Sequence, residues 1–370
     1  MLMRPGTASH RSFCVGVSIL AVCALLHGCV AIQRVPTAAI VIRPQVCYPR
    51  IPIEFDGRSS SAGRGHIAEY RWRFSDGSTA IGSVVKHQFQ SPGSHSVQLQ
   101  ITTGNGEIAS TSREMTVIDA LVVPGSYSRI QDAIDAAASG GTIVVLPGTY
   151  RENLRIQGKT IVLTSTNPSD VDVVRSTIVV GSEYGRPTVN FGGDSYATMS
   201  GFTIMPGQAG EENAAQCGAC GGSIYIREAS PYIKNNRIIN ATDAGIAIYE
   251  SAAHIENNVF QNCSSVLPGG AISIDSYRRA PTVIGNIFEG NKAPSGGAIF
   301  ITAGLPAANA EASSAAATTV KDNEFRNNTA TQFGGGAIFV EYYGRLLVTS
   351  PDSNKYVGNS PNDIVRTIPH

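Results

Sequence analysis

The chain has 370 residues, of which 39 are Gly and only 15% are charged. This length allows more than one domain, and the abundance of Gly favours β structure with many turns. The formal net charge is zero and the sequence contains no basic run, so nucleic acid is not expected as a partner.

Residues 1–28 are predicted to be a signal peptide. Arg4 and Arg11 precede an apolar run over residues 13–26. This run is too short to span a membrane comfortably and has the length of the apolar part of a signal peptide. The mature chain is therefore expected to be exported.

The end of this run, Leu26-His-Gly-Cys29, resembles the bacterial lipoprotein box, although His27 stands where a small or branched residue is usual. The resemblance implies a lipid on Cys29, which would attach the protein to a membrane, and a tether over residues 29–37. Because Val30 is not Asp, it also implies the outer membrane. Cleavage a few residues further on would instead give a secreted or periplasmic protein.

Residues 38–119 contain short runs in which apolar and polar side chains alternate. Examples are Tyr70-Arg-Trp-Arg-Phe74 and Val97-Gln-Leu-Gln-Ile101. This alternation predicts strands with one buried face, as an immunoglobulin-like two-sheet sandwich requires. Trp72, the only Trp, is expected between the sheets.

Four phrases of this segment resemble the signature of PKD (polycystic-kidney-disease-type) modules. They are Phe55-Asp-Gly57, Trp72-Arg-Phe-Ser-Asp-Gly77, His87-Gln-Phe89 and Pro92-Gly93. Such modules act as spacers or adhesion units, so the resemblance implies presentation of another domain and no chemistry of its own.

A short amphipathic helix is predicted next. Ser128-Arg-Ile-Gln131 reads as a capping box, apolar residues follow at helical spacing, and Gly140-Gly141 ends the helix. A helix at this place would cover the open apolar end of a solenoid.

Residues 120–370 are predicted to form that solenoid. A phrase recurs in which Gly comes one or two residues before an Ile-x-Ile or Ile-x-Val run. Its aligned isoleucines lie 22, 26, 27 and 39 residues apart; they are Ile224, Ile246, Ile272, Ile299 and Ile338. This period predicts one coil per repeat, with equivalent residues stacked about 4.8 Å apart. The longest spacing contains an Ala/Ser/Thr-rich segment, residues 303–319, which is expected to be a surface loop.

Two further columns follow from the same alignment. One is apolar (Ile238, Phe260, Phe288, Phe325), and the other is a ladder of amides (Asn236, Asn258, Asn286, Asn323). These repeats resemble the right-handed parallel β-helix of the pectin-lyase-like superfamily, and in particular the polymorphic outer-membrane autotransporters. The predicted fold is therefore all-β: an immunoglobulin-like β-sandwich followed by a right-handed parallel β-helix with an N-terminal capping helix.

One early phrase, Pro147-Gly-Thr-Tyr-Arg-Glu152, resembles the opening motif of pectin methylesterases. In that family this part is structural, and the later blocks with its catalytic Asp and Arg residues are not recognisable in this sequence. The resemblance therefore does not imply that activity.

Four cysteines lie beyond the export segment: Cys47, Cys217, Cys220 and Cys263. A disulfide between Cys217 and Cys220 is possible in an exported protein. No second Cys pair or paired His accompanies them, so no metal site and no cofactor is expected.

The residue three places after each aligned Ile is expected to point outward, which gives the column Arg227, Tyr249, Asp275, Thr302 and Glu341. An Arg, a Tyr and carboxylates along one face suit a polysaccharide ligand or another cell-surface glycan. We therefore expect a surface-attached protein whose β-helix serves carbohydrate binding or adhesion, with Arg227, Tyr249, Asp275 and Glu341 as ligand-binding residues.

Two alternatives remain open. The first is an enzyme, because the carboxylates of this column and the adjacent Glu250 are of the kind that glycoside hydrolysis needs. In this case the protein is a polysaccharide lyase or glycoside hydrolase with Asp275 in its site. A purely structural envelope protein without a ligand is the other alternative.

Overall fold

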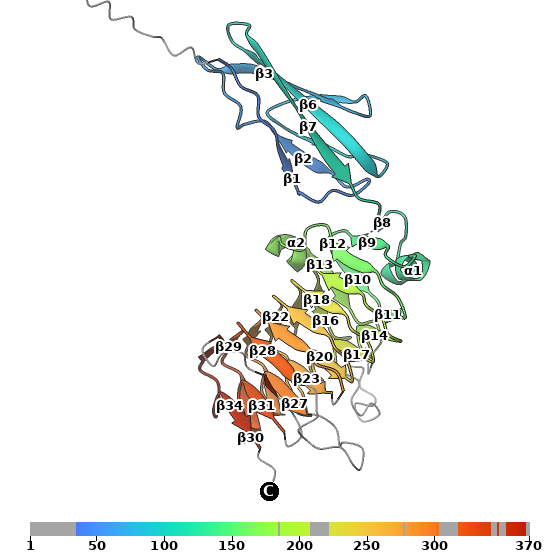
Figure 1. Cartoon of the computed structure of the whole chain (residues 1–370), viewed down its shortest axis with the longest axis vertical. Coiled ribbons are helices and arrows are strands. Elements are labelled where there is room, and N and C mark those ends of the chain that lie inside the picture. Colours follow the sequence, from blue (N-terminus) through green and yellow to red (C-terminus); the bar gives the residue numbers. More distant parts are fainter. Residues whose placement is uncertain are drawn as a thin grey trace, which may run out of the picture.

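The computed structural model describes residues 35–183, 186–207, 222–276, 278–302, 317–341, 346–347 and 353–367. The predicted signal peptide, the lipidation site Cys29, most of the predicted tether, and the Cys217–Cys220 pair lie outside these residues. Figure 1 shows a small antiparallel unit followed by a stack of parallel coils. Neither helix in the described part of the chain is long and apolar enough to cross a membrane.

The first unit is a sandwich of two antiparallel sheets. A three-stranded sheet has the order β1 (Val41–Arg43), β2 (Ile53–Asp56), β5 (Val84–His87), and a four-stranded sheet has the order β4 (Thr79–Ile81), β3 (Ile67–Phe74), β6 (Gly93–Thr103), β7 (Ile108–Val117). Trp72 is fully buried between the sheets, as predicted, and its ring centroid lies 6.1 Å from that of Phe55. Its indole N–H donates to the carbonyl of Gly82 at 2.8 Å, so the buried polar atom is satisfied.

The second unit is built from three parallel sheets, which we call sheets I, II and III. Each successive coil adds one strand to each sheet, so sheet neighbours are residues that lie one repeat apart in the sequence. Sheet I has the order β11 (Leu154–Gln157), β14 (Val189–Gly192), β17 (Ile224–Arg227), β20 (Ile246–Tyr249), β23 (Ile272–Asp275), β27 (Ile299–Thr302), β31 (Ile338–Val340), β34 (Ile364–Arg366).

The other two sheets complete the coils. Sheet II has the order β8 (Leu121–Val123), β9 (Thr142–Val145), β12 (Val162–Ser165), β15 (Thr198–Ser200), β18 (Tyr232–Lys234), β21 (His254–Glu256), β24 (Thr282–Ile284), β28 (Thr318–Lys321), β32 (Leu346–Leu347). Sheet III has the order β10 (Gly148–Arg151), β13 (Thr177–Val180), β16 (Thr203–Met205), β19 (Arg237–Ile239), β22 (Val259–Gln261), β25 (Ile287–Glu289), β29 (Glu324–Arg326), β33 (Lys355–Val357). A small additional parallel pair is formed by β26 (Lys292–Ser295) and β30 (Thr329–Gly334).

The strand register confirms the predicted repeat. Ile224 pairs with Ile246, Ile246 with Ile272, Ile272 with Ile299, and Ile299 with Ile338; all five are fully buried. The predicted aromatic column is a stack in which the Phe260 and Phe288 rings lie 4.9 Å apart and the Phe288 and Phe325 rings 4.8 Å apart. The spacing of this stack is the distance between neighbouring strands of one sheet.

The predicted Asn ladder is also confirmed, and each rung has the same geometry. The side-chain oxygen of Asn286 accepts from both the backbone N and the side-chain N of Asn258, at 2.8 and 3.0 Å, and Asn323 does the same for Asn286. The ladder continues to Asn354. A second ladder, which the sequence analysis did not assign, joins Asn291, Asn328 and Asn359.

Helix α1 (Ile130–Ala136) buries Ile130, Ala133 and Ile134 against the first coils, as predicted. The predicted capping box is wrong, because Ser128 makes no capping hydrogen bond and Arg129 is the N-cap residue. The carboxylate of Glu152 takes that role and accepts from the backbone N–H groups of Ile130 and Gln131 at 2.9 and 3.0 Å. The helix start is thus satisfied by a residue of the first coil.

Three local boundaries also differ from the predictions. The run 176–180, Ser-Thr-Ile-Val-Val, predicts a strand, but Ser176 ends a second helix, α2 (Val171–Ser176). Asp170 caps the start of this helix by accepting from the backbone N–H groups of residues 172 and 173. The run 199–204 predicts a further strand, but it is divided between β15 and β16 by Gly201, which has a φ of +85°. The predicted loop 303–319 ends earlier, because Thr318 and Thr319 belong to β28.

The two units meet at one hydrophobic cluster. Tyr48 and Ile51 of the sandwich pack with Val122 and Val144, which belong to β8 and β9 of the first coils. All four side chains are buried, so the junction is a packed contact between the two units.

Candidate ligand face on sheet I

The register places the predicted outward residues of sheet I in one column. Arg227 pairs with Tyr249, Tyr249 with Asp275, and Asp275 with Thr302. Glu341 follows β31, and its backbone N donates to the carbonyl of Ile301 at 2.9 Å. The predicted alignment is therefore present, while the ligand-binding role of these residues stays a prediction.

Arg227 and Tyr249 make the most specific contact of the column. The guanidinium carbon of Arg227 lies 5.1 Å from the centroid of the Tyr249 ring, within the range of a cation–π interaction. The pKa of the Arg227 guanidinium is raised, mostly by Tyr225 and to a smaller extent by Glu228. A carboxylate oxygen of Glu228 lies 3.5 Å from the Arg227 Nε. Arg227 therefore presents a positive charge next to a ring that remains 40% exposed.

The carboxylates of this face lie on different coils. The backbone N of Glu250 donates to the carbonyl of Asp275 at 2.9 Å, so these two residues are on adjacent coils, as predicted. Asp275 and Glu341 are two coils apart, or about 10 Å at the usual strand spacing. This separation along the coil axis exceeds both the ≈5–5.5 Å of a retaining glycosidase pair and the ≈6.5–9.5 Å of an inverting pair.

Two acidic residues next to the column have a left-handed backbone. Glu228 and Glu250 have φ values of +51° and +42°, and each directly follows its sheet I strand. Gly158 and Gly193 hold the same place after β11 and β14, with φ values of +61° and +59°. A side chain in this conformation carries about 1–2 kcal/mol of strain. The turn therefore holds two carboxylates beside the candidate ligand face, at positions where glycine would be less strained.

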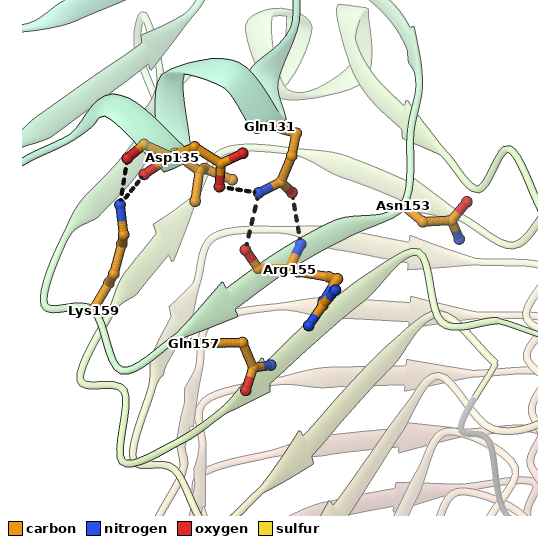
Figure 2. A pocket seen from close by; sticks show the side chains of 7 residues that line it. Gln131, Asp135, Asn153, Arg155, Gln157 and Lys159 are labelled. Carbon is orange, nitrogen blue, oxygen red and sulfur yellow. Dashed lines mark hydrogen bonds between the residues drawn. The ribbon is translucent and has the colours of Figure 1, made fainter.

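A depression of about 360 Å³ extends this face toward α1, as Figure 2 shows. Arg155 and Gln157 of β11 line it. Arg155 pairs with Asn190, which in turn pairs with Tyr225, and Gln157 pairs with Gly192. A Cβ at Gly192 would lie 2.6 Å from the Gln157 side-chain oxygen, so the amide of Gln157 occupies the space that the glycine leaves.

Helix α1 forms one wall of this depression and is fixed to β11. The Gln131 amide accepts from the backbone N of Arg155 at 2.8 Å and donates to its carbonyl at 3.2 Å (Figure 2). The Lys159 ammonium donates to the carbonyls of Ile134 and Asp135 at 2.6 and 2.8 Å, at the C-terminal end of the helix. The Arg155 guanidinium makes no hydrogen bond or ion pair within the described part of the chain and thus faces the depression without a partner.

Sequence reasoning missed Arg155, Gln157 and Tyr225. The first strand, Leu154-Arg-Ile-Gln157, alternates like the later strands of sheet I, and its Leu154 and Ile156 are fully buried. This alternation was the available signal. The first coils lack the Gly-containing phrase that defines the repeat, so the sequence alone does not align this strand with the later ones. Tyr225 lies within that phrase, one residue after the aligned Ile224.

Two family models match the chain. A model described as "PKD domain" matches residues 33–118, and one described as "Right handed beta helix region" matches residues 170–314. The chain is a PKD domain followed by a right-handed β-helix. The sequence resemblances to these two folds are thereby confirmed.

Curated relatives match part of this chain. A microbial collagenase of Vibrio alginolyticus is 35% identical over 92 residues, which are 25% of this chain and 11% of that protein. Collagenase ColA of Clostridium perfringens is 33% identical over 67 residues, 18% of this chain and 6% of that protein. This chain thus spans about a tenth or less of these relatives.

Among solved structures, the pectin methylesterase PemA of Erwinia chrysanthemi is similar to this chain with 12% sequence identity and a TM-score of 0.31. The match covers 64% of this chain and 92% of the enzyme. The PKD1 domain of the metalloprotease PrtV of Vibrio cholerae has 23% identity and a TM-score of 0.20, over 22% of this chain and 96% of that domain.

Proposed function

We propose that this protein is an exported, surface-attached lipoprotein whose β-helix binds a polysaccharide on the outer face of sheet I. The observation that carries the proposal is the contact of Arg227 with the exposed ring of Tyr249, followed by Asp275 on the next coil. Aromatic faces stack on the apolar side of sugar rings, and charged groups bind hydroxyl and carboxylate groups. A column with regular coil spacing suits a ligand that itself repeats.

The proposed attachment is a lipid on Cys29, which would place the protein at the outer membrane, with the PKD domain as a spacer. The lipoprotein box and the order of the domains in the sequence support this arrangement. Expression of the full chain in a bacterial host with labelled palmitate tests it. Wild type and the control Cys23→Ala are expected to carry the label in the membrane fraction, and Cys29→Ala to lose it. Label that persists in Cys29→Ala would reject the anchor.

Binding is tested by affinity electrophoresis and glycan arrays with the purified mature chain. Tyr249→Ala and Arg227→Gln are expected to weaken retention by the bound glycan at least roughly tenfold, because the stacked pair would be lost. Tyr232→Ala, which changes a Tyr on sheet II, is the matched control and should leave retention unchanged. If Tyr249→Ala and Arg227→Gln are retained as strongly as wild type and Tyr232→Ala, the outer face of sheet I is not the binding site.

The enzymatic alternative is separated from binding by following reducing ends and unsaturated products with a panel of uronic-acid and neutral polysaccharides. We expect no turnover. Turnover that disappears in Asp275→Ala, while the variant still binds the glycan, would replace the binding proposal by a lyase or hydrolase. Retention by no glycan and turnover of none would instead favour a purely structural role.

A further inference from the structure

Helix α2 creates a cavity on a different side of the β-helix. The helix is fixed over sheet III, where the Thr203 hydroxyl donates to the carbonyl of Val174 at 2.8 Å. Between α2 and strands β19, β22 and β25 lies a shallow cavity of about 480 Å³ that is largely open to solvent. Its apolar wall consists of Pro168, Val171, Val174 and Val259, and polar side chains make up the rest of the lining. Pockets with apolar walls and a few convergent polar groups are the usual form of small-molecule sites.

Two arginines line this cavity, which we call the α2 cavity. Arg237 makes one side-chain hydrogen bond among the described residues, to the Gln261 oxygen at the long distance of 3.5 Å. Arg175 makes an ion pair with Asp172 at 4.0 Å, and both side chains are largely exposed. A guanidinium has five N–H donors, so most of the donors of this pair are available.

The two positive charges act on one another. The pKa of Arg237 is lowered, first by burial and second by the charge of Arg175. Both effects are unfavourable for the cation, and a bound anion would reverse the second. A negatively charged ligand bound between the two guanidinium groups would offset this repulsion.

The acidic residue of the cavity does not neutralise this pair. Glu289 accepts from the Gln261 amide at 3.1 Å, and it is the register partner of Arg326 on the next coil. Arg326 carries a raised pKa, to which Glu324 contributes most and Glu289 least. Arg237 therefore has no carboxylate partner among the described residues, whereas Arg175 has Asp172 at 4.0 Å.

Two amides complete the cavity. Asn235 and Asn257 line it, both have a left-handed backbone with φ near +55°, and neither side chain makes a hydrogen bond within the described residues. Together with Gln261 they offer donors and acceptors at fixed places. Such groups suit hydroxyls on a ligand whose charged end lies at the arginines.

We propose that the α2 cavity binds an oxyanion carried by a polyhydroxylated ligand. Arg175 and Arg237 take the carboxylate, sulfate or phosphate group, and the amides of Asn235, Asn257 and Gln261 take the hydroxyls. This site lies on sheet III and does not depend on the proposed function of sheet I.

The test is calorimetric titration of the full mature chain with four probes: sodium sulfate, sodium phosphate, D-glucuronate and D-glucose. We expect saturable binding of at least one anion and none of glucose at the same concentration. Arg237→Gln and Arg175→Gln should each weaken binding roughly tenfold or more, because each removes hydrogen bonds to a charged group. Whichever anion binds most tightly identifies the ligand's charged group as carboxylate, sulfate or phosphate.

Two controls make the result decisive. Arg151→Gln changes an exposed arginine of the same sheet outside the cavity and should leave affinity unchanged. Arg227→Gln separates this site from sheet I, because anion binding should survive it. Arg175 is largely exposed, so its variant is expected to fold even where Arg237→Gln does not. The absence of saturable binding, or equal affinity in wild type and Arg175→Gln, would overturn the proposal.

Discussion

The PKD domain and the β-helix build their cores in opposite ways. The PKD domain has a core of side chains, among them Trp72, Phe55 and Phe89, that do not recur at a fixed spacing in the sequence. The β-helix buries the same side-chain types again and again, coil upon coil. A core residue of the PKD domain therefore has no equivalent residue stacked against it. A core residue of the β-helix packs against equivalent residues of the preceding and following coils.

Each unit also contains a buried free thiol that can report its unfolding. Burial raises the pKa of Cys47 in the PKD domain to about 11 and that of Cys263 in the β-helix to about 12. Both thiols should resist alkylation at pH 8 until their unit opens, because only the thiolate reacts. Alkylation followed by peptide mass mapping thus measures the stability of the two units separately.

The largest effect is expected for Trp72→Ala. Truncation of a fully buried Trp costs about 3–5 kcal/mol in unfolding free energy. Cys47 should become alkylated at a lower denaturant concentration while Cys263 keeps its midpoint. Arg73→Ala, on the exposed side of the same strand, is the control and should change neither midpoint. A parallel shift of both thiols would mean that the two units unfold together.

The next largest effect is expected for Asn286→Ala. The substitution removes the acceptor of two Asn258 donors and leaves the buried backbone and side chain of the neighbouring rungs unsatisfied. We expect a loss of roughly 2–4 kcal/mol in the β-helix alone, read from Cys263. Asn190→Ala serves as the control, because among the described residues its side chain accepts one hydrogen bond, from Gln157 at 3.3 Å on the outer face. A loss of less than about 1 kcal/mol would show that the ladder tolerates single gaps.

A smaller effect is expected at the start of helix α1, which is capped by Glu152 of the first coil. Glu152→Gln removes the charge that holds the start of α1 and should cost about 1 kcal/mol. Hydrogen exchange of the α1 amides should accelerate, while that of the Asn ladder should not change. Asp132→Asn, at an exposed position in the same first turn, should have less effect. Unchanged exchange in Glu152→Gln would show that burial of Ile130 and Ile134 alone fixes the helix.

The smallest effect should appear only in acid, and in the PKD domain. Hydrogen bonds from Arg58, first through its side chain and then through its backbone N, lower the pKa of Asp56 well below its usual range. Because the folded pKa is the lower one, the stabilisation is complete above the ordinary pKa of about 4 and is lost as the pH falls below it. The denaturation midpoint of the PKD domain, read in acid from the fluorescence of Trp72, the only Trp, should therefore decrease below about pH 4, and Asp56→Asn should flatten this dependence. A dependence that persists in Asp56→Asn would assign it to other carboxylates.

What the sequence could predict follows from the same contrast. Repetition made the Ile, Phe and Asn columns visible, because five related phrases determine the phase of the coils and hence which side chains share a face. The PKD domain lacks such repetition, and its strands and the position of Trp72 came from two-residue alternation and a known signature.

Contacts that occur once could not be predicted. Glu152 lies 22 residues from Ile130, and no periodic pattern connects a coil residue to a helix start. The α2 cavity depends on a helix of six residues, for which Asp170 was the only local signal. Arg175 and Arg237 come together through the fold, because Arg175 belongs to that helix and Arg237 to a strand of a later coil.

The packed junction of Tyr48 and Ile51 with Val122 and Val144 has a mechanical consequence. Swinging one unit against the other would expose these apolar side chains to water, so bending at this point is opposed by the hydrophobic effect. A force applied to the PKD domain would accordingly be transmitted into β8 and β9, the first two strands of sheet II. The outer faces of sheets I and III would thus keep a fixed orientation relative to the PKD domain.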